Sequence, residues 1–514
     1  MDSKMILYRG SLKSCNYSCS YCPFAKHPSS AREMEKDRMD WMKFCKSLEE
    51  RAEDLGRFAL MVVPYGEALI HPWYWEGLAF LSRLKQAEAV GVQTNFSFSA
   101  GQAGKLWREA KGRKEKLRLW ATYHPEMVSP ARFAKECREA AEEGIALCAG
   151  AVGVPENLSL IGELRRCLPD EIYLWINAMD GLKRAYTREE VQAFSAIDPF
   201  FIRELSAVPA NFKNCRNRLF VEGNGKMQTC NISGRMPGNW YQEDFSFPSA
   251  VCRQKACSCY LAYGGRGDWV NTLLFGKYPL FRIPRYFPAV FLDIDGTLLQ
   301  EGEREIDPLT AASLKVLKKM GTRLFFATSL PVPEAKKRCA NVWELFDGGI
   351  FAVGAHLLWK EAGQKHGQMP RNKIRQKEAL HQEYQEILYP LDEAVLSAVK
   401  ARYKSLHCRL YAYRNKGKLY KITLCRREGC GWERAEERFL QDVLPETRKG
   451  SVRFLREENC MQVIPAGASK ENGVKIICQK IGISPKQAAA VGDSAEDESM
   501  LLLCSEGIKL QSVK

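Results

Sequence analysis

Short apolar runs alternate with amphipathic stretches along the first 180 residues of this 514-residue chain. Nearly continuous apolar runs predict six buried strands, at residues 5–8, 58–63, 89–94, 117–123, 145–152 and 171–177. Apolar residues at helical spacing predict intervening helices, among them 39–53, 75–85, 130–143 and 157–167. The alternation indicates an α/β fold with a parallel sheet covered by helices, and an open or partial βα barrel fits it. In such folds the chemistry lies at the carboxyl ends of the strands.

This alternation ends near residue 200. Residues 201–280 are rich in loops and cysteines, and residues 281–288 are rich in proline and aromatic residues, which is typical of a linker. A new apolar strand at 289–292 opens a second α/β domain that we expect to span 289–514. We expect the first domain to span 1–200.

Composition narrows the class of protein. No apolar run approaches the ~18 residues of a membrane span, and the first residues lack the long apolar stretch of a signal peptide. We therefore expect a cytoplasmic protein with no membrane partner. The net charge of +15 suits phosphorylated small molecules as well as RNA, but the chain has no basic tail or block. We expect a phosphorylated small-molecule substrate and no nucleic acid.

Nineteen cysteines in a long chain without a secretory signal indicate metal or cluster ligation rather than disulfides. Cys15, Cys19 and Cys22 lie in the loop after the first predicted strand. Three thiolates in one loop can hold three irons of a [4Fe–4S] cluster and leave the fourth iron open for another ligand. The alternative is a structural zinc site whose fourth ligand is His27 or Cys45.

This cysteine spacing, on the first loop of a βα domain with six strands, resembles the radical S-adenosylmethionine (SAM) superfamily. Phrases such as YRGSLKSCNYSCSYCPFAKH and PYGEALIHPWY look like a small bacterial family of that superfamily with no assigned substrate, and the resemblance covers residues 1–285. The residues that match its SAM-binding motifs are Tyr21, Gly66, Glu67, Thr94, Asn95, His124, Gly153 and Asn177. The Gly-Glu pair lacks the first glycine and the proline of the family's GGEP motif.

The resemblance implies a fold, a reaction and a partner. The fold is a partial (β/α)6 barrel. The reaction is reductive cleavage of SAM to a 5′-deoxyadenosyl radical, which abstracts a hydrogen atom from the substrate. The electron would come from a reductant such as flavodoxin or ferredoxin.

Five further cysteines follow, at Cys215, Cys230, Cys252, Cys257 and Cys259. The first two fit the opening pattern of the SPASM and twitch auxiliary-cluster domains, and the phrase VEGNGKMQTCN between them predicts a hairpin. Five thiols compete for at most four positions. We expect one further [4Fe–4S] cluster on the first four, with Cys259 as a substitute ligand. Zinc is the alternative, because it accepts the same four thiolates.

A third group of residues points to phosphoryl transfer. Asp293 and Asp295 follow the strand at 289–292, where one carboxylate can attack phosphorus while the other handles the proton of the leaving group. Both can also hold one Mg²⁺, the second through its backbone. Thr328 ends an apolar strand and fits a phosphoryl contact, and Lys470 fits charge neutralisation. The magnesium site would be completed by Asp493 and Asp497.

These elements, in this order, resemble the haloacid dehalogenase (HAD) superfamily of phosphatases. The segment at about 355–460 looks like the α/β cap of the Cof-type branch, whose members mostly hydrolyse sugar phosphates and related small phosphoesters. Three positions depart from that branch. Val353 replaces an asparagine, Leu330 replaces an arginine, and Gln462 stands where a glutamate is common. A HAD fold that has lost its activity is the alternative.

Together the motifs predict a bifunctional enzyme. The first half would transform a small substrate by radical chemistry. The second would remove phosphate from that substrate, its product or a pathway partner. Two alternatives stay open: a radical SAM enzyme that modifies peptides, with an accessory HAD domain, and a non-enzymatic iron–sulfur redox sensor.

Overall fold

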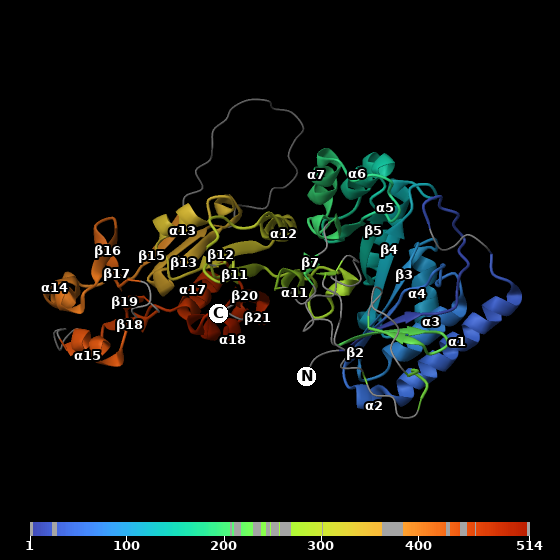
Figure 1. Cartoon of the computed structure of the whole chain (residues 1–514), viewed down its shortest axis with the longest axis horizontal. Coiled ribbons are helices and arrows are strands. Elements are labelled where there is room, and N and C mark those ends of the chain that lie inside the picture. The colour runs from blue at the N-terminus through green and yellow to red at the C-terminus, as the bar shows by residue number, and fades with distance from the viewer. Residues whose placement is uncertain are drawn as a thin grey trace. The chain divides into compact units, whose positions relative to one another are not determined.

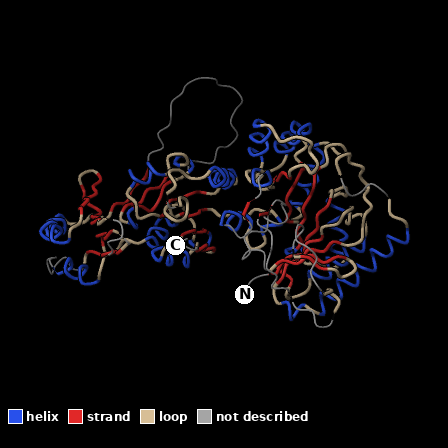
Figure 2. The backbone as a smooth tube through the Cα atoms, viewed as in Figure 1, coloured by secondary structure: helices blue, strands red, loops and turns tan. Residues whose placement is uncertain are grey.

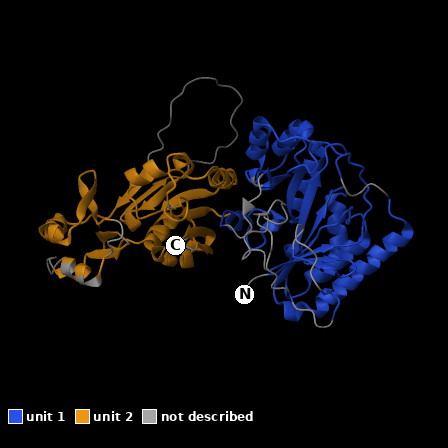
Figure 3. Cartoon of the chain, in the orientation of Figure 1, with its two compact units in different colours: residues 1–285 blue, residues 286–514 orange. Residues whose placement is uncertain are grey.

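The computed structural model of the chain divides into two compact units, Met1–Arg285 and Tyr286–Lys514 (Figure 1, Figure 3). The division falls inside the segment 281–288 that the sequence suggests as a linker. The structure describes residues 4–22, 28–205, 208–209, 217–229, 238–242, 247, 256–257, 269–300, 302–361, 384–427, 432–442, 450–457 and 459–510. No helix among these residues is long and apolar enough to cross a membrane.

The first unit is built on an eight-stranded sheet with the order β6-β5-β4-β3-β2-β1-β8-β9. Every neighbouring pair is parallel except β8 and β9. The strands are β1 (Lys4–Arg9), β2 (Phe58–Val62), β3 (Ala87–Thr94), β4 (Leu117–Tyr123), β5 (Ala146–Val152), β6 (Leu174–Asn177), β8 (Arg218–Glu222) and β9 (Met227–Gln228). All six strands expected from the apolar runs are present. Their carboxyl ends lie at one edge of the sheet.

Helices alternate with these strands (Figure 2). They are α1 (Ala31–Glu50), α2 (Ala52–Leu55), α3 (Pro72–Ser82), α4 (Ala100–Glu109), α5 (Pro130–Glu142), α6 (Leu158–Cys167), α7 (Arg188–Ile197), α8 (Ile202–Leu205) and α11 (Trp269–Phe275). A short separate pair joins β7 (Val208–Pro209) to β10 (Ala256–Cys257). Helix α1 begins eight residues before the predicted start, because Ser30 and Glu33 form a capping box there.

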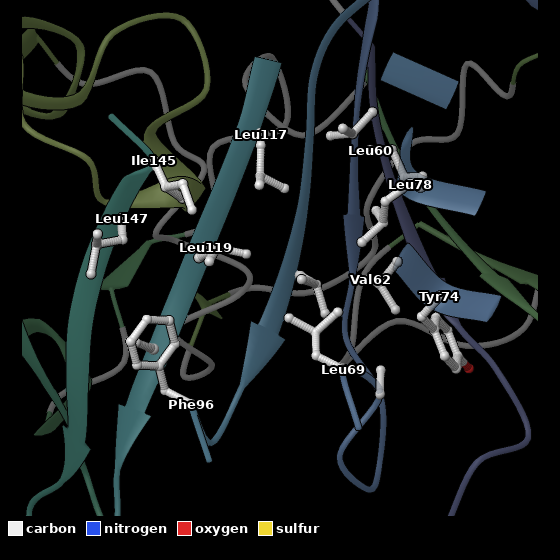
Figure 4. Close-up of a cluster of buried hydrophobic side chains, with 14 of the residues drawn as sticks. Leu60, Val62, Leu69, Tyr74, Leu78, Phe96, Leu117, Leu119, Ile145 and Leu147 are labelled. Atoms are coloured by element: carbon white, nitrogen blue, oxygen red, sulfur yellow. The ribbon is translucent and has the colours of Figure 1, made fainter. Parts of the chain in front are cut away.

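The main core of this unit lies between one face of the sheet and the helices. Leu60 and Val62 of β2 and Leu119 of β4 belong to it, with Tyr74 and Leu78 of α3 (Figure 4). Side chains alternate between the two faces of a strand. In β1, Ile6 and Tyr8 belong to this core, so Met5, Leu7 and Arg9 point to the opposite face of the sheet.

The second unit contains a seven-stranded sheet with the order β15-β14-β13-β12-β11-β20-β21. It is parallel except where β14 pairs with β13 and β15. Its strands are β11 (Ala289–Leu292), β12 (Arg323–Ala327), β13 (Gly348–Phe351), β14 (His356–Lys360), β15 (Tyr384–Leu388), β20 (Ala488–Gly492) and β21 (Glu506–Lys509). Its helices are α12 (Pro308–Lys319), α13 (Val332–Arg338), α17 (Lys470–Lys480) and α18 (Glu498–Leu503).

A four-stranded antiparallel sheet is inserted between β15 and α17, with the order β16-β17-β19-β18. It contains β16 (Arg409–Asn415), β17 (Lys418–Cys425), β18 (Val452–Arg456) and β19 (Cys460–Pro465), with α14 (Glu393–Arg402) and α15 (Arg434–Asp442). This subdomain has a later start than the predicted cap. Residues 356–360 and 384–388 belong instead to the larger sheet, because a tight turn after β13 returns the chain along that strand as β14.

Candidate functional site

The cysteine loop follows β1 directly. Cys19 is buried, and Cys15 and Cys22 are half-buried. Burial, together with the neighbouring thiols of Cys22 and Cys15, raises the pKa of Cys19 to about 11. The three thiols thus sense one another's charge, and they could ionise together only next to a strong positive charge. An iron–sulfur core supplies that charge, so the donor set fits a cluster.

Side chains from the ends of β3 and β4 contact this loop. The Asn95 side-chain amide donates to the Cys15 sulfur at 3.5 Å, and the Tyr17 backbone N–H donates to it at 3.4 Å. The Cys19 sulfur lies 3.2 Å from Nδ1 of His124. Burial lowers the pKa of His124 to about 4, so its ring is neutral at pH 7. Hydrogen bonds to cysteine sulfur are the contacts by which proteins orient cluster ligands and tune the cluster's potential.

Tyr21 and His124, both expected from the motifs, contact each other. The Tyr21 hydroxyl lies 2.9 Å from Nδ1 of His124, and the two rings stack with centroids 6.0 Å apart. The ring of Tyr17 meets the same imidazole edge-on, 5.7 Å between centroids. His124 therefore links the cysteine loop to the end of β4.

Glu67 lies after β2 and is fully enclosed. One of its oxygens accepts from the Leu69 N–H at 2.9 Å and the Thr94 hydroxyl at 2.8 Å, and the other accepts from the Asn95 N–H. Burial raises its pKa to about 7, against these hydrogen bonds, which favour the ionised form. The carboxylate joins the ends of β2 and β3, and so positions the residue that contacts Cys15.

Gly66 allows the backbone after β2 to lie directly against the cysteine loop. A Cβ atom at this position would lie 1.8 Å from the carbonyl oxygen of Ser14, and the next N–H, of Glu67, donates to that same oxygen at 3.0 Å. Only glycine fits this approach. The match to a glycine-containing motif therefore has a local structural reason.

Replacing Gly66 with alanine is expected to displace the loop that carries Cys15. We expect the free energy of unfolding of the first unit to fall by about 1–3 kcal/mol and the iron content of anaerobically purified protein to fall with it. Gly101→Ala is the matched control, since a Cβ there meets nothing within 4 Å. Denaturant unfolding and iron analysis measure both effects. A Gly66→Ala protein as stable and iron-rich as Gly101→Ala would contradict this account.

Gly153 and Asn177 lie together at the ends of β5 and β6. The Gly153 N–H donates to the Asn177 carbonyl at 2.7 Å, and the Tyr186 hydroxyl donates to the Gly153 carbonyl at 2.8 Å. They share the sheet edge at which the cysteine loop begins.

The structure describes only some of the remaining predicted thiol and imidazole ligands of this unit. Cys215, Cys230, Cys252, Cys259 and His27 lie outside the described residues, and the backbone of Cys257 lies on β10 while its side chain is not described. The predicted hairpin between the first two cysteines is present as β8 and β9. Cys45 lies on the buried face of α1, in the hydrophobic core, where burial raises the pKa of its thiol, so it is a core residue rather than a zinc ligand.

The second unit gathers four charged side chains at the ends of β11 and β20. Among the described residues, the carboxylates of Asp293, Asp493 and Asp497 form a group whose ligand oxygens lie within 4.8 Å of one another. The ammonium of Lys470 lies 2.8 Å from Asp293 and 2.6 Å from Asp497. Gly296 makes this clustering possible, because a Cβ there would lie 2.1 Å from the Asp493 carboxylate.

The electrostatics of this cluster favour a cation. Burial raises the pKa of Asp293 to about 7; Lys470 opposes the shift and Asp497 adds to it. Burial alone would lower the pKa of Lys470, but the two aspartates outweigh it and raise that pKa. Three carboxylates facing one ammonium leave excess negative charge, which a divalent ion with oxygen ligands would neutralise. The residues therefore fit Mg²⁺.

Asp295, which we expect to contribute to the metal site through its backbone, has its side chain outside this carboxylate group. Its carboxylate pairs with the guanidinium of Arg338 on α13, and its side chain is 46% exposed. An exposed carboxylate outside the metal group fits proton exchange with a leaving group. Sequence reasoning missed Arg338. Leu330, where the family has an arginine, was the only signal that a cation would come from elsewhere.

Thr328 ends β12 as predicted and is buried. Its N–H donates to the Ile350 carbonyl at 2.8 Å, and its hydroxyl oxygen accepts from the Leu330 N–H at 3.1 Å. The Val353 N–H donates to the Thr328 carbonyl at 3.1 Å. Val353 has φ of 55°, a left-handed conformation that is costly for a β-branched residue and that asparagine adopts readily. This conformation gives a physical reason for the asparagine that the Cof-type branch has at the position of Val353.

One residue of the inserted subdomain, Lys421, contacts the segment that follows β12. Lys421 of β17 is buried, and its ammonium donates to the carbonyl of Ser329, next to Thr328, at 2.6 Å. Burial lowers the pKa of Lys421 to about 8. Sequence reasoning missed this lysine, although a cation between the apolar residues of LYKITL was a signal. Gln462 of β19 is buried, and its amide donates to Glu457.

Comparison with known proteins agrees with this geometry in the second unit. The family model described as haloacid dehalogenase-like hydrolase matches residues 290–343 and 403–512. These ranges include all six predicted phosphoryl-transfer residues. The second unit therefore contains a haloacid dehalogenase-like hydrolase domain.

One curated protein matches a short stretch of this chain. The Arabidopsis thaliana protein named endoribonuclease YBEY, chloroplastic, is 38% identical over 56 residues, which is 11% of this chain and 10% of that protein. The chain thus spans about a tenth of the length of this curated relative.

Two solved structures from Bacteroides thetaiotaomicron are also similar. A haloacid dehalogenase-like hydrolase is 16% identical, over 45% of this chain and 90% of that one, with a TM-score of 0.34. A phosphatase of the same superfamily is 15% identical, over 43% and 83%, with a TM-score of 0.33.

Proposed function

We propose that this chain is a bifunctional enzyme, with a Mg²⁺-dependent phosphatase in the second unit and a radical SAM enzyme in the first. The observation that carries the phosphatase is the contact of Lys470 with both Asp293 and Asp497 inside the matched hydrolase domain. The observation that carries the radical half is the meeting of the cysteine loop with Gly66, Asn95 and His124.

In the phosphatase, Asp293 acts as the nucleophile. Its carboxylate attacks phosphorus, the bond to the leaving oxygen breaks, and Asp295 donates the proton that the leaving alcohol needs. Water then hydrolyses the aspartyl phosphate, with Asp295 as the base. Lys470 holds Asp293 in place and neutralises charge that develops on the phosphoryl group. Bound Mg²⁺ would supply a Lewis acid for the same oxygens, held by Asp293, Asp493 and Asp497.

Several features support the radical half. The first six strands are parallel and adjacent in chain order, an arrangement that suits a partial barrel. A [4Fe–4S] cluster on Cys15, Cys19 and Cys22 would supply the electron that cleaves SAM. Asn95 and His124 orient two of the thiolates, and Glu67 fixes the backbone beside them.

The phosphatase is tested on the full-length protein with p-nitrophenyl phosphate and a panel of sugar phosphates. Phosphate release should require Mg²⁺, stop when EDTA removes the metal, and return when Mg²⁺ is added back. Hydrolysis that survives EDTA would contradict the metal assignment. A lack of Mg²⁺-dependent release from every phosphoester would favour an inactive HAD fold.

The radical half is tested by anaerobic incubation with SAM and a strong reductant. Formation of 5′-deoxyadenosine, even without substrate, supports the proposal. Its complete absence in protein with a full complement of iron would favour the redox sensor.

A further inference from the structure

A cavity of about 180 Å³ opens at the carboxyl ends of β1 and β8 in the first unit. The side chains that define its chemistry are Arg9, Tyr65, Phe220, Glu222, Lys226 and Gln228. None of them is among the predicted metal-ligating, SAM-binding or catalytic residues. It is smaller than the ~300–1,000 Å³ of a drug-sized site, so it suits a small polar group with a few attached atoms.

The cavity lies on the sheet face opposite α1. In β8, Leu219 and Val221 belong to the core, so Phe220 and Glu222 point to the other face, as Arg9 does in β1. Arg9 and Glu222 are register partners in the parallel pair. The cavity is also close to the cysteine loop, since Tyr65 immediately precedes Gly66, which lies against Ser14.

Arg9 is held in one orientation. Its Nε donates to the Val63 carbonyl at 3.3 Å, and Nη1 donates to the Tyr65 hydroxyl at 3.4 Å. The guanidinium carbon lies 4.8 Å from the ring centroid of Tyr65 and 5.5 Å from that of Phe220. A guanidinium stacked on aromatic rings loses little further freedom when it binds an oxyanion.

The charges around this arginine favour an anion. Lys226 comes from the turn between β8 and β9, which the Glu222 N–H closes by donating to the Lys226 carbonyl at 2.9 Å. Among the described residues that line the cavity, Arg9 and Lys226 are cationic and Glu222 is the one carboxylate. The Tyr65 hydroxyl and the Gln228 amide add neutral donors. Four donor side chains in one lining suit the three oxygens of a phosphate better than the two of a carboxylate.

We propose that this cavity binds the phosphate group of a small phosphorylated metabolite, which is the substrate of the radical half. The assignment as substrate rests on the proposed radical SAM function, whereas phosphate binding does not. A phosphorylated substrate would also give a chemical reason for a phosphatase on the same chain.

Lysine footprinting of the full-length protein tests the site. An N-hydroxysuccinimide ester acetylates exposed lysines, and peptide mass spectrometry reads each position. EDTA is present, so that the hydrolase site lacks its metal. Inorganic phosphate is the probe and should protect Lys226 in a saturable way. Lys46 and Lys105, whose side chains are 77% and 72% exposed, should stay unprotected as internal controls.

Two variants with opposite expected effects keep the test independent of folding. Arg9→Gln should raise the half-maximal phosphate concentration at least about tenfold. Glu222→Gln removes the carboxylate found among the described lining residues and should lower that concentration about two- to fivefold. A misfolded protein cannot bind more tightly. Arg57→Gln, at an exposed arginine of the same unit, should change nothing.

The outcomes separate the two proposals. Absence of saturable protection, or protection that persists in Arg9→Gln, would overturn the site. Equal protection by acetate would overturn the assignment to phosphate. The footprint needs no SAM, iron or turnover. An absence of 5′-deoxyadenosine formation would therefore refute the radical half and leave the phosphate site standing.

Discussion

Asp293→Asn is expected to abolish phosphate release while 5′-deoxyadenosine formation continues unchanged. An amide cannot attack phosphorus, and loss of a covalent nucleophile typically lowers the rate by roughly 10⁴- to 10⁶-fold. The fold should survive, because asparagine has the same shape and Lys470 keeps its contact with Asp497 at 2.6 Å. Both activities are measured on the same preparation, the first as released phosphate and the second by chromatography.

Asp307→Asn is the matched control for this variant. It is the same chemical change in the same unit, at an exposed residue that caps α12 by accepting from the Leu309 and Thr310 N–H groups. Asparagine caps a helix as well as aspartate does, so both activities should stay at the wild-type level. Retained phosphatase activity in Asp293→Asn would place the nucleophile elsewhere. Loss of both activities would mean that the two sites are not separate.

The strands were the most predictable part of the fold. Each of the first six is a nearly continuous apolar run, and a parallel strand buried on both faces leaves such a run in the sequence. The start of α1 was less predictable. Its first turns are mostly exposed and lack apolar periodicity, so the signal was the capping box at Ser30 and Glu33. The limits of the cap depended on the pairing of β14 with β13, which no local pattern specifies.

The residues of the candidate sites also differ in how well the sequence predicts them. Asp293 and Thr328 could be predicted because each directly follows an apolar strand, and the carboxyl ends of parallel strands meet at one edge. Arg338 and Lys421 could not be assigned to the site, because their positions depend on how a helix and an inserted sheet pack against the strand ends. A lysine within an apolar strand shows that a cation is buried, but the sequence does not say which carbonyl it meets.

Cys19→Ala is expected to remove one cluster and to stop 5′-deoxyadenosine formation. Two thiolates cannot hold three irons, and Cys19 is the most buried of the three cysteines, so outside thiols reach its place least easily. The iron and sulfide content of anaerobically purified protein should fall by the equivalent of one cluster rather than to zero if a second cluster is present. The amount of 5′-deoxyadenosine should fall to that of a protein-free control.

Cys167→Ala provides the comparison that makes this result specific. Cys167 is half-buried at the end of α6 and belongs to neither predicted ligand set, so its loss should leave iron and activity unchanged. Full iron content in Cys19→Ala, or an equal loss in Cys167→Ala, would contradict cluster ligation by the loop after β1. Metal analysis of the same samples also decides between iron and zinc. If the loop held a structural zinc ion, Cys19→Ala would lose zinc and not iron. A structural zinc site has no open coordination position, and SAM cleavage needs one.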